Sequence, residues 1–164
     1  MNHATTRLLR AWSALPEFNL AVFALLLNFP WEVLQAPLFK GMALAPHSAV
    51  VGACLQATFG DMAIMLLAHA SVAVVARRRF WMLAPSRFEV AGFVAVGVGI
   101  TALIEWLATR GHWFQSWAYS PGMPVIPGIE VGLSPLLQWA IVPLVTLWFV
   151  RRQSVHVGAV DEQT

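Results

Sequence analysis

Three acidic side chains, Glu32, Asp61 and Glu105, stand inside long apolar stretches of this chain. A charged side chain in the hydrocarbon of a bilayer costs at least ~2.5–3.5 kcal/mol, so such residues normally face a bundle interior, a partner or a water-filled cavity. Carboxylates from separate helices can converge on a hard cation, and crowded carboxylates in a low dielectric share protons. The three acids are therefore the candidate site.

Polar side chains accompany the acids at helical spacing. Asn28, Glu32 and Gln35 fall at i, i+4 and i+7, which places them along one face of a helix. The other polar stripes are Thr58 with Asp61, Thr101 with Glu105, and Ser134 with Gln138. A bundle with a polar interior needs one such stripe on each helix. We expect Asn28, Gln35 and Gln138 to supply hydrogen bonds at the acidic site.

The elements that must position these residues are membrane-spanning helices. Of the 164 residues, 59% are hydrophobic and 11% are charged, which is too apolar for a soluble domain of this length. Crossing ~30 Å of hydrocarbon takes about 20 residues of helix, and apolar runs of that order occur at 18–39, 50–76, 88–109 and 133–150. The sequence predicts an all-α fold, in which residues 1–164 form a single integral membrane domain built as a four-transmembrane-helix bundle.

The distribution of Lys and Arg predicts the orientation. Eight of the ten basic residues flank the spans on one side, and Lys40 and Arg110 lie on the other. The positive-inside rule makes the basic side cytoplasmic, so the topology is N-in/C-in. Each acid then stands 15 or 16 residues from the cytoplasmic flank of its span, which is ~22–24 Å at the helical rise and lies in the outer half of the bilayer. The basic balance suits anionic headgroups, so we expect membrane lipids as partners and no nucleic acid.

Two segments outside the spans carry aromatic residues. Residues 2–15 are predicted to form a short N-terminal interfacial helix. The outer loop 110–132 contains Trp113, Trp117 and Tyr119, and then three prolines within seven residues that prevent a regular helix. These aromatic residues suit an interfacial aromatic belt. The alternative is a lid, with Trp113, Trp117 and Tyr119 forming the outer wall of the acidic site.

Small residues mark one face of the third span. Ala91, Ala95 and Gly99 recur every four residues, and this spacing lets helix backbones approach closely. The pattern predicts a close-packing face. It also raises the alternative that the chain assembles with other membrane subunits or with copies of itself.

Motifs of well-known enzyme and cofactor sites do not occur in the sequence. There is no HExxH, no Glu-x-x-His pair, no Cys/His cluster, no phosphate loop and no nucleotide fingerprint. The residue pattern assigns neither a metal, a cofactor nor catalytic residues. It leaves open whether the chain is an enzyme.

Three runs carry a resemblance: NFPWEVLQAPL at 28–38, GD at 60–61 and GLSPLLQW at 132–139. They resemble patterns in an uncharacterised family of small bacterial polytopic inner-membrane proteins with no known activity. The resemblance covers most of the chain. It implies the bacterial cytoplasmic (inner) membrane and implies no activity.

The leading expectation is an integral membrane protein with an acidic polar pocket in the outer half of the bilayer. Such a pocket would bind a cation or a small amphipathic molecule. Two alternatives stay open. One is a non-catalytic accessory subunit of a larger membrane complex. The other is an intramembrane enzyme that acts on a lipid-like substrate, with a carboxyl as general acid or base.

Overall fold

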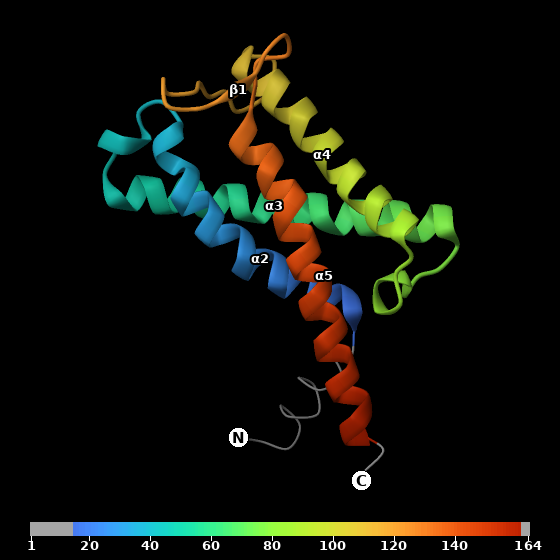
Figure 1. Cartoon of the computed structure of the whole chain (residues 1–164). Helices are drawn as coiled ribbons and strands as arrows, with labels where there is room; N and C mark the ends of the chain where they lie inside the picture. The colour runs from blue at the N-terminus through green and yellow to red at the C-terminus, as the bar shows by residue number, and fades with distance from the viewer. Residues whose placement is uncertain (1–14, 162–164) are drawn as a thin grey trace.

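The computed structural model describes residues 15–161, with side chains described up to residue 153 (Figure 1). The described part of the chain is almost entirely helical. Its main elements are the helices α2 (Pro16–Gln35), α3 (His47–Ala76), α4 (Arg87–Thr109) and α5 (Leu133–Asp161). The minor elements are the 3₁₀ turns η1 (Ala36–Leu38), η2 (Met42–Leu44) and η3 (Trp81–Leu83), and the two-residue strands β1 (Val125–Ile126) and β2 (Val131–Gly132).

All four long helices are long and apolar enough to cross a membrane. The chain is therefore an all-α, multi-pass membrane protein, as the sequence predicted. The predicted spans correspond to α2 with η1, to α3, to α4 and to the first part of α5. The predicted interfacial helix at 2–15 falls almost wholly on residues outside the described part of the chain.

Local sequence signals explain where the helices begin and end. Pro16 stands at the start of α2, where its missing N–H is not needed. Ser86 and Glu89 form a capping box at the start of α4, in which the Ser86 side chain accepts from the Glu89 N–H and the Glu89 carboxylate accepts from the Ser86 N–H. At the end of α3, Arg77 adopts a left-handed conformation with φ of 53°.

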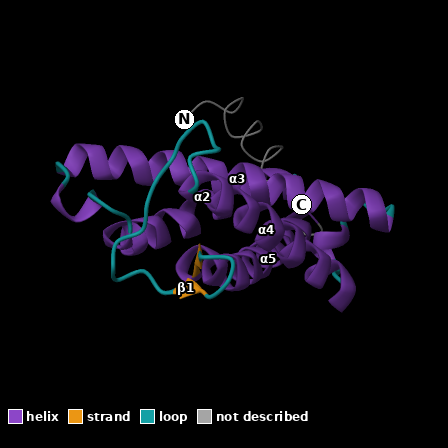
Figure 2. Cartoon of the chain, turned by 90° about the horizontal axis from the view of Figure 1, so that it is seen from above, coloured by secondary structure: helices purple, strands orange, loops and turns teal. Residues whose placement is uncertain are grey.

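The helices pack in a ring. Each helix packs against the next one in sequence, and α5 returns to pack against α2, so α2 is diagonal to α4 and α3 to α5. Figures 1 and 2 show the loop that carries β1 at one end of this bundle. We call this the loop end and the opposite end, which carries η3 and the arginines of loop 77–86, the basic end.

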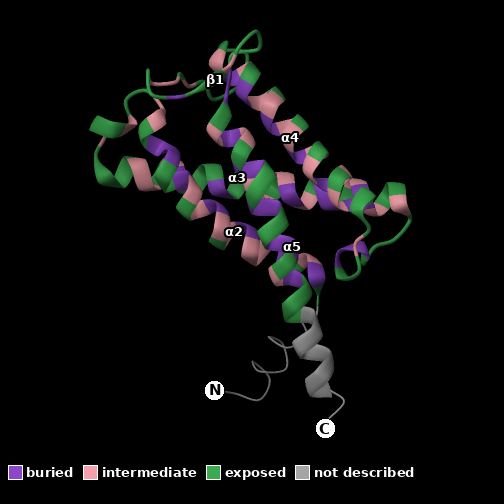
Figure 3. Ribbon diagram, in the orientation of Figure 1, coloured by how far each residue is buried: buried purple, intermediate pink, exposed green. Residues whose placement is uncertain are grey.

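The buried residues change character along the bundle axis (Figure 3). On α2 the buried positions run from Leu20 and Ala24 near the basic end to Asn28, Glu32 and Gln35 near the loop end. The apolar core at the basic side is made of Leu20, Ala24, Met65, Ala68, Val72, Trp81, Met82, Phe93, Trp139, Val142, Leu147 and Val150. The core on the basic side is therefore mainly apolar, although Asn19, His69 and Thr146 are also buried there, and the half of the bundle towards the loop end, which we call the polar half, carries the acids and amides.

One glycine sets the closest approach between α4 and α5. A Cβ built on Gly97 would lie 1.9 Å from Cε3 of the fully buried Trp139. The face predicted from Ala91, Ala95 and Gly99 is not used within the chain. All three residues are exposed, and a Cβ on Gly99 meets nothing within 4 Å. The prediction of a close-packing face is therefore wrong for this chain's own helix packing, because Gly97 lies on the opposite side of α4.

Loop 110–132 is anchored across the loop end by backbone hydrogen bonds. A single antiparallel bridge pairs Phe39 with Tyr119, and the amides of Lys40 and Ser120 donate to the carbonyls of Ala118 and Leu38 at 2.8 Å. The same loop then forms the β1–β2 hairpin that leads into α5. The loop is therefore held over the polar half of the bundle.

Candidate functional site

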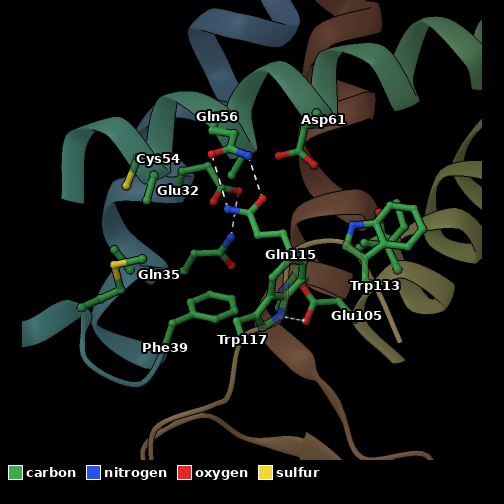
Figure 4. Close-up of a pocket in the computed structure, with 18 of the residues that line it drawn as sticks. Glu32, Gln35, Phe39, Cys54, Gln56, Asp61, Glu105, Trp113, Gln115 and Trp117 are labelled. Carbon is green, nitrogen blue, oxygen red and sulfur yellow. Dashed lines mark hydrogen bonds between the residues drawn. The ribbon is translucent and has the colours of Figure 1, made fainter. Parts of the chain in front are cut away.

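A cavity of about 370 Å³ opens in the polar half, beneath loop 110–132 (Figure 4). All four long helices and the loop contribute to its lining. The helices supply Glu32 and Gln35 from α2; Ala53, Cys54, Gln56, Ala57, Gly60, Asp61 and Ile64 from α3; Thr101, Ile104 and Glu105 from α4; and Pro135 and Gln138 from α5. The connecting segments supply Ala36, Phe39, Lys40, Met42 and residues 113–117. Ligand pockets commonly have volumes of ~300–1,000 Å³, so this cavity has room for a small molecule.

The cavity gathers most of the residues that the sequence singled out. Seven of the nine line it: Glu32, Gln35, Asp61, Glu105, Trp113, Trp117 and Gln138. Asn28 and Tyr119 do not line it, but each hydrogen-bonds to a residue that does. The predicted juxtaposition of the acids thus has a structural counterpart in one shared cavity.

Gln138 is the centre of the hydrogen-bond network. Its Nε2 lies 2.7 Å from Asp61 Oδ2, 2.8 Å from Asn28 Oδ1 and 3.0 Å from Glu32 Oε1. Its Oε1 accepts from Nε2 of Gln35 at 3.2 Å. Because Asp61 is on α3 and Gln138 on α5, this side chain spans the diagonal of the bundle and ties α2, α3 and α5 together.

Gln35 fixes the position of the Glu32 carboxyl group. Gln35 Nε2 donates to Glu32 Oε1 at 2.8 Å, one turn away on the same helix. Its own Oε1 accepts from the Ser134 hydroxyl at 2.9 Å. The side chains of Gln35, Gln138 and Glu32 are all buried, with at most 8% of each residue exposed. A buried network in which the donors and acceptors have partners holds its side chains rigidly, so the Glu32 carboxyl group presents a fixed geometry to the cavity.

Glu105 is held separately, by the loop. Its Oε2 accepts from the Tyr119 hydroxyl at 2.5 Å and from the Trp117 indole N–H at 3.0 Å. No hydrogen bond from the described residues reaches its other oxygen, Oε1. The Tyr119 oxygen in turn accepts from the Gly132 N–H at 2.8 Å. The loop thereby orients Glu105 and leaves Oε1 without a protein partner.

The Tyr119 phenol stays neutral over a wide pH range. Burial raises the pKa of Tyr119 above its ordinary value, and the adjacent Glu105 carboxylate raises this pKa further. The Gly132 N–H opposes both effects but does not outweigh them. Tyr119 is therefore a hydrogen-bond donor to Glu105 and not a source of negative charge.

Aromatic and amide side chains form the side of the cavity nearest the loop. Phe39 and Trp117 meet edge to face, with ring centroids 6.4 Å apart. Gln56 of α3 and Gln115 of the loop exchange amide hydrogen bonds of 2.7 and 3.4 Å. This exposed pair links the loop to α3 across the cavity (Figure 4).

Acidic groups outnumber basic groups in the lining of the cavity. Three carboxyl groups line it, against the single ammonium of Lys40. The ion pairs within the described residues are Arg78–Glu89 and Arg79–Glu17, which involve neither Lys40 nor any cavity acid. Within the same residues, no group of three His, Cys, Asp or Glu side chains is arranged to hold a metal ion. The three acids therefore surround a cavity and do not converge on one point.

Several lining residues lay outside the sequence prediction. Gln56, Gln115 and Lys40 carry no periodic signal, because the loop and the chain fold-back bring them to the cavity. Cys54 did carry a signal, because it lies seven residues before Asp61 and therefore on the same helical face. Its buried thiol lines the cavity.

Comparisons with known proteins do not supply a site. The chain matches no family model, no curated protein and no solved structure. The roles assigned to residues below accordingly rest on the contacts described above.

Proposed function

We propose that this chain is a ligand-binding protein of the bacterial inner membrane, and that its cavity binds a small molecule with a positive charge and an apolar body. The observation that carries this proposal is the lining of the cavity, in which Glu32, Asp61 and Glu105 face aromatic side chains with no ion-paired cation between them. Buried carboxylates without cationic partners favour a cationic ligand, because burial strengthens the attraction between opposite charges.

The aromatic residues refine the class of ligand. Trp113, Trp117 and Phe39 line the same cavity as the acids. The face of an aromatic ring attracts a cation within about 6 Å of its centroid, and such rings recognise organic ammonium groups. An inorganic ion would use only the oxygen ligands, whereas an organic cation would use both the carboxylates and the rings.

The distribution of basic residues supports access from the outer side. By the positive-inside rule, the arginines of loop 77–86 support a cytoplasmic location for the basic end. The cavity lies at the loop end, and the apolar core fills the bundle on the basic side. A ligand would therefore enter from the outer half of the bilayer or from the outer aqueous phase.

Binding of benzyltrimethylammonium to the purified protein tests this proposal. This probe has a fixed positive charge, and neopentylbenzene is its neutral isostere. We expect the cation to bind and Asp61→Asn to weaken its binding at least about tenfold, which corresponds to ~1.4 kcal/mol. Glu130→Gln is the matched control, because Glu130 is exposed in the loop and does not line the cavity. Equal binding of the two probes, or unchanged binding of the cation to Asp61→Asn, would show that the cavity recognises only the apolar body of the probe and would contradict the proposal.

A second candidate function, that of a subunit in a larger membrane complex, is favoured by one observation. Ala91, Ala95 and Gly99 form an exposed stripe of small residues on α4 that the chain's own helices leave uncovered. Small residues allow another transmembrane helix to approach closely. If the stripe is an interface, Ala95→Leu should abolish co-purification with the partner, whereas Ile141→Phe on the exposed side of α5 should not.

A further inference from the structure

The amide nitrogen at the centre of the site has more acceptors around it than it has hydrogens. Gln138 Nε2 carries two hydrogens, but Asn28, Glu32 and Asp61 each place an oxygen 2.7–3.0 Å from it. Asn28 cannot turn its amide round without losing the 2.8 Å bond from its Nδ2 to the Ala24 carbonyl. One of the three contacts therefore lacks a hydrogen when both acids are ionised.

Glu32 and Asp61, which we call the carboxyl pair, are brought close together because an oxygen of each contacts the same nitrogen of Gln138, at 3.0 and 2.7 Å. Two carboxylates in such proximity commonly share a single proton, because like charges at short range in a low dielectric cannot both ionise. A proton on one member of the pair lets that carboxyl group donate to the other, so that only one of the two acids needs a hydrogen from Gln138. The positions of the two acids beside Gln138 Nε2 therefore suit a singly protonated pair.

The groups that surround the carboxyl pair do not remove the need for this proton. Helix α4 contributes Glu105, and α3 contributes the Cys54 thiol, whereas α5 presents the uncharged Gln138. From the loop, the neutral phenol of Tyr119 stands behind Glu105. Lys40 lines the same cavity but forms no ion pair with either member of the carboxyl pair. The carboxyl pair therefore has no ion-pair partner among the described residues.

Thr101 is an independent polar feature of the cavity lining. Its side chain lines the cavity and the residue is only 7% exposed, yet its Oγ1 has no hydrogen-bond partner among the described residues. Helical threonines normally bond to a carbonyl one turn back, as Thr58 and Thr109 do here. The protein's described residues therefore leave a buried hydroxyl beside the cavity without a hydrogen-bond partner.

We infer that the carboxyl pair holds one proton in the empty cavity and gives it up when an organic ammonium ion binds, so that ligand binding is coupled to proton release. This inference rests on the proposed function and adds to it a proton stoichiometry. The ammonium group would take the place of the shared proton beside Glu32 and Asp61. The apolar body would lie against Trp113 and Trp117, with Thr101 on the α4 side.

The exchange conserves charge and breaks a single bond. The O–H bond of the protonated carboxyl group breaks heterolytically, its electron pair stays on the carboxylate, and the proton passes to water. The ligand keeps all of its bonds and contributes only its positive charge. The proton leaves at the loop end, through the cavity that the carboxyl pair lines.

Calorimetric titration with benzyltrimethylammonium measures this coupling directly. The probe has no titratable proton, so every proton released comes from the protein. Titrations in two buffers of different ionisation enthalpy should show ~1 proton released per probe bound, and the Kd should rise about tenfold for each pH unit of acidification while the pair is protonated. In infrared difference spectra, a protonated-carboxyl band should disappear when the probe binds.

Two variants separate this inference from the proposed function. Asp61→Asn should abolish both the proton release and the loss of the carboxyl band, whereas Glu130→Gln should change neither. Binding of the probe without proton release, with a Kd independent of pH, would overturn the inference and leave the proposed function standing. Failure of the folded wild-type protein to bind the probe at any pH would overturn both.

Discussion

The close approach of α4 and α5 at Gly97 makes a sharp test of the packing. In Gly97→Ala the new methyl group would lie 1.9 and 2.0 Å from two ring carbons of Trp139, whereas ordinary contacts begin at 3.4 Å. The ring is 1% exposed, so the clash of about 1.5 Å must be relieved by moving a buried indole or separating two helices. Overpacking of this kind typically costs ~1–3 kcal/mol. A shift of Trp139 would also displace its neighbour Gln138 and loosen the polar network.

Gly99→Ala is the matched control, because it is the same substitution two residues further along α4. A Cβ there meets nothing within 4 Å, and alanine improves helix propensity by up to ~1 kcal/mol over glycine at both positions. We expect Gly97→Ala to be the less stable variant by ~1–3 kcal/mol in reversible unfolding measured in mixed micelles. Adding Trp139→Leu should recover part of the loss. Equal stability of the two glycine variants would refute the packing of α4 against α5 described here.

Two further predictions concern the loop that covers the cavity. Tyr119 is the only tyrosine in the chain, so an ultraviolet titration of tyrosine reports on this residue alone. Because the pKa of Tyr119 is raised, tyrosinate should appear only above pH ~10, the ordinary pKa of tyrosine. Glu105→Gln should lower the midpoint of this titration. Since the pKa of Tyr119 is higher in the folded than in the unfolded protein, the stability that Tyr119 contributes should be complete below pH ~10 and decline above it. A titration midpoint at the ordinary tyrosine pKa would contradict the Tyr119–Glu105 contact. Gln115→Ala removes both hydrogen bonds to the exposed Gln56 and should raise the association and dissociation rates of the probe together in stopped-flow fluorescence. A change in Kd of more than about tenfold (~1.4 kcal/mol) would mean that Gln115 binds the ligand instead of holding the loop.

The location of the cavity fits one-sided access. Along α2 the residues Asn28, Glu32 and Gln35 are buried near the loop end, and Leu20 and Ala24 are buried nearer the basic end. The carboxyl groups therefore lie on the loop-end side of the apolar core.

The spans and their polar faces could be predicted from sequence because both depend on local periodicity. A run of apolar residues long enough to cross a bilayer must be helical, and residues at i, i+4 and i+7 must share a face. For this reason Asn28, Glu32 and Gln35 were placed on one stripe, and the structure shows all three buried on α2.

The packing partner of α4 could not be predicted in the same way. Ala91, Ala95 and Gly99 have the spacing of a packing motif, but the structure leaves them exposed and uses Gly97. The spacing of residues in the sequence shows which of them share a face of a helix. Which face packs against a neighbouring helix depends on the side chains that this neighbour presents. Here that side chain is Trp139 of α5.

The sequence by itself determined that Glu32, Asp61 and Glu105 lie in helices long and apolar enough to span a membrane, because composition and run length fix the element type. The tertiary structure alone decided how the acids are grouped. Gln138 reaches across the bundle diagonal to join Glu32 and Asp61, whereas loop residues Trp117 and Tyr119 hold Glu105 apart from them. These contacts join segments far apart in the chain, and their geometry depends on how four helices and a loop fill space together.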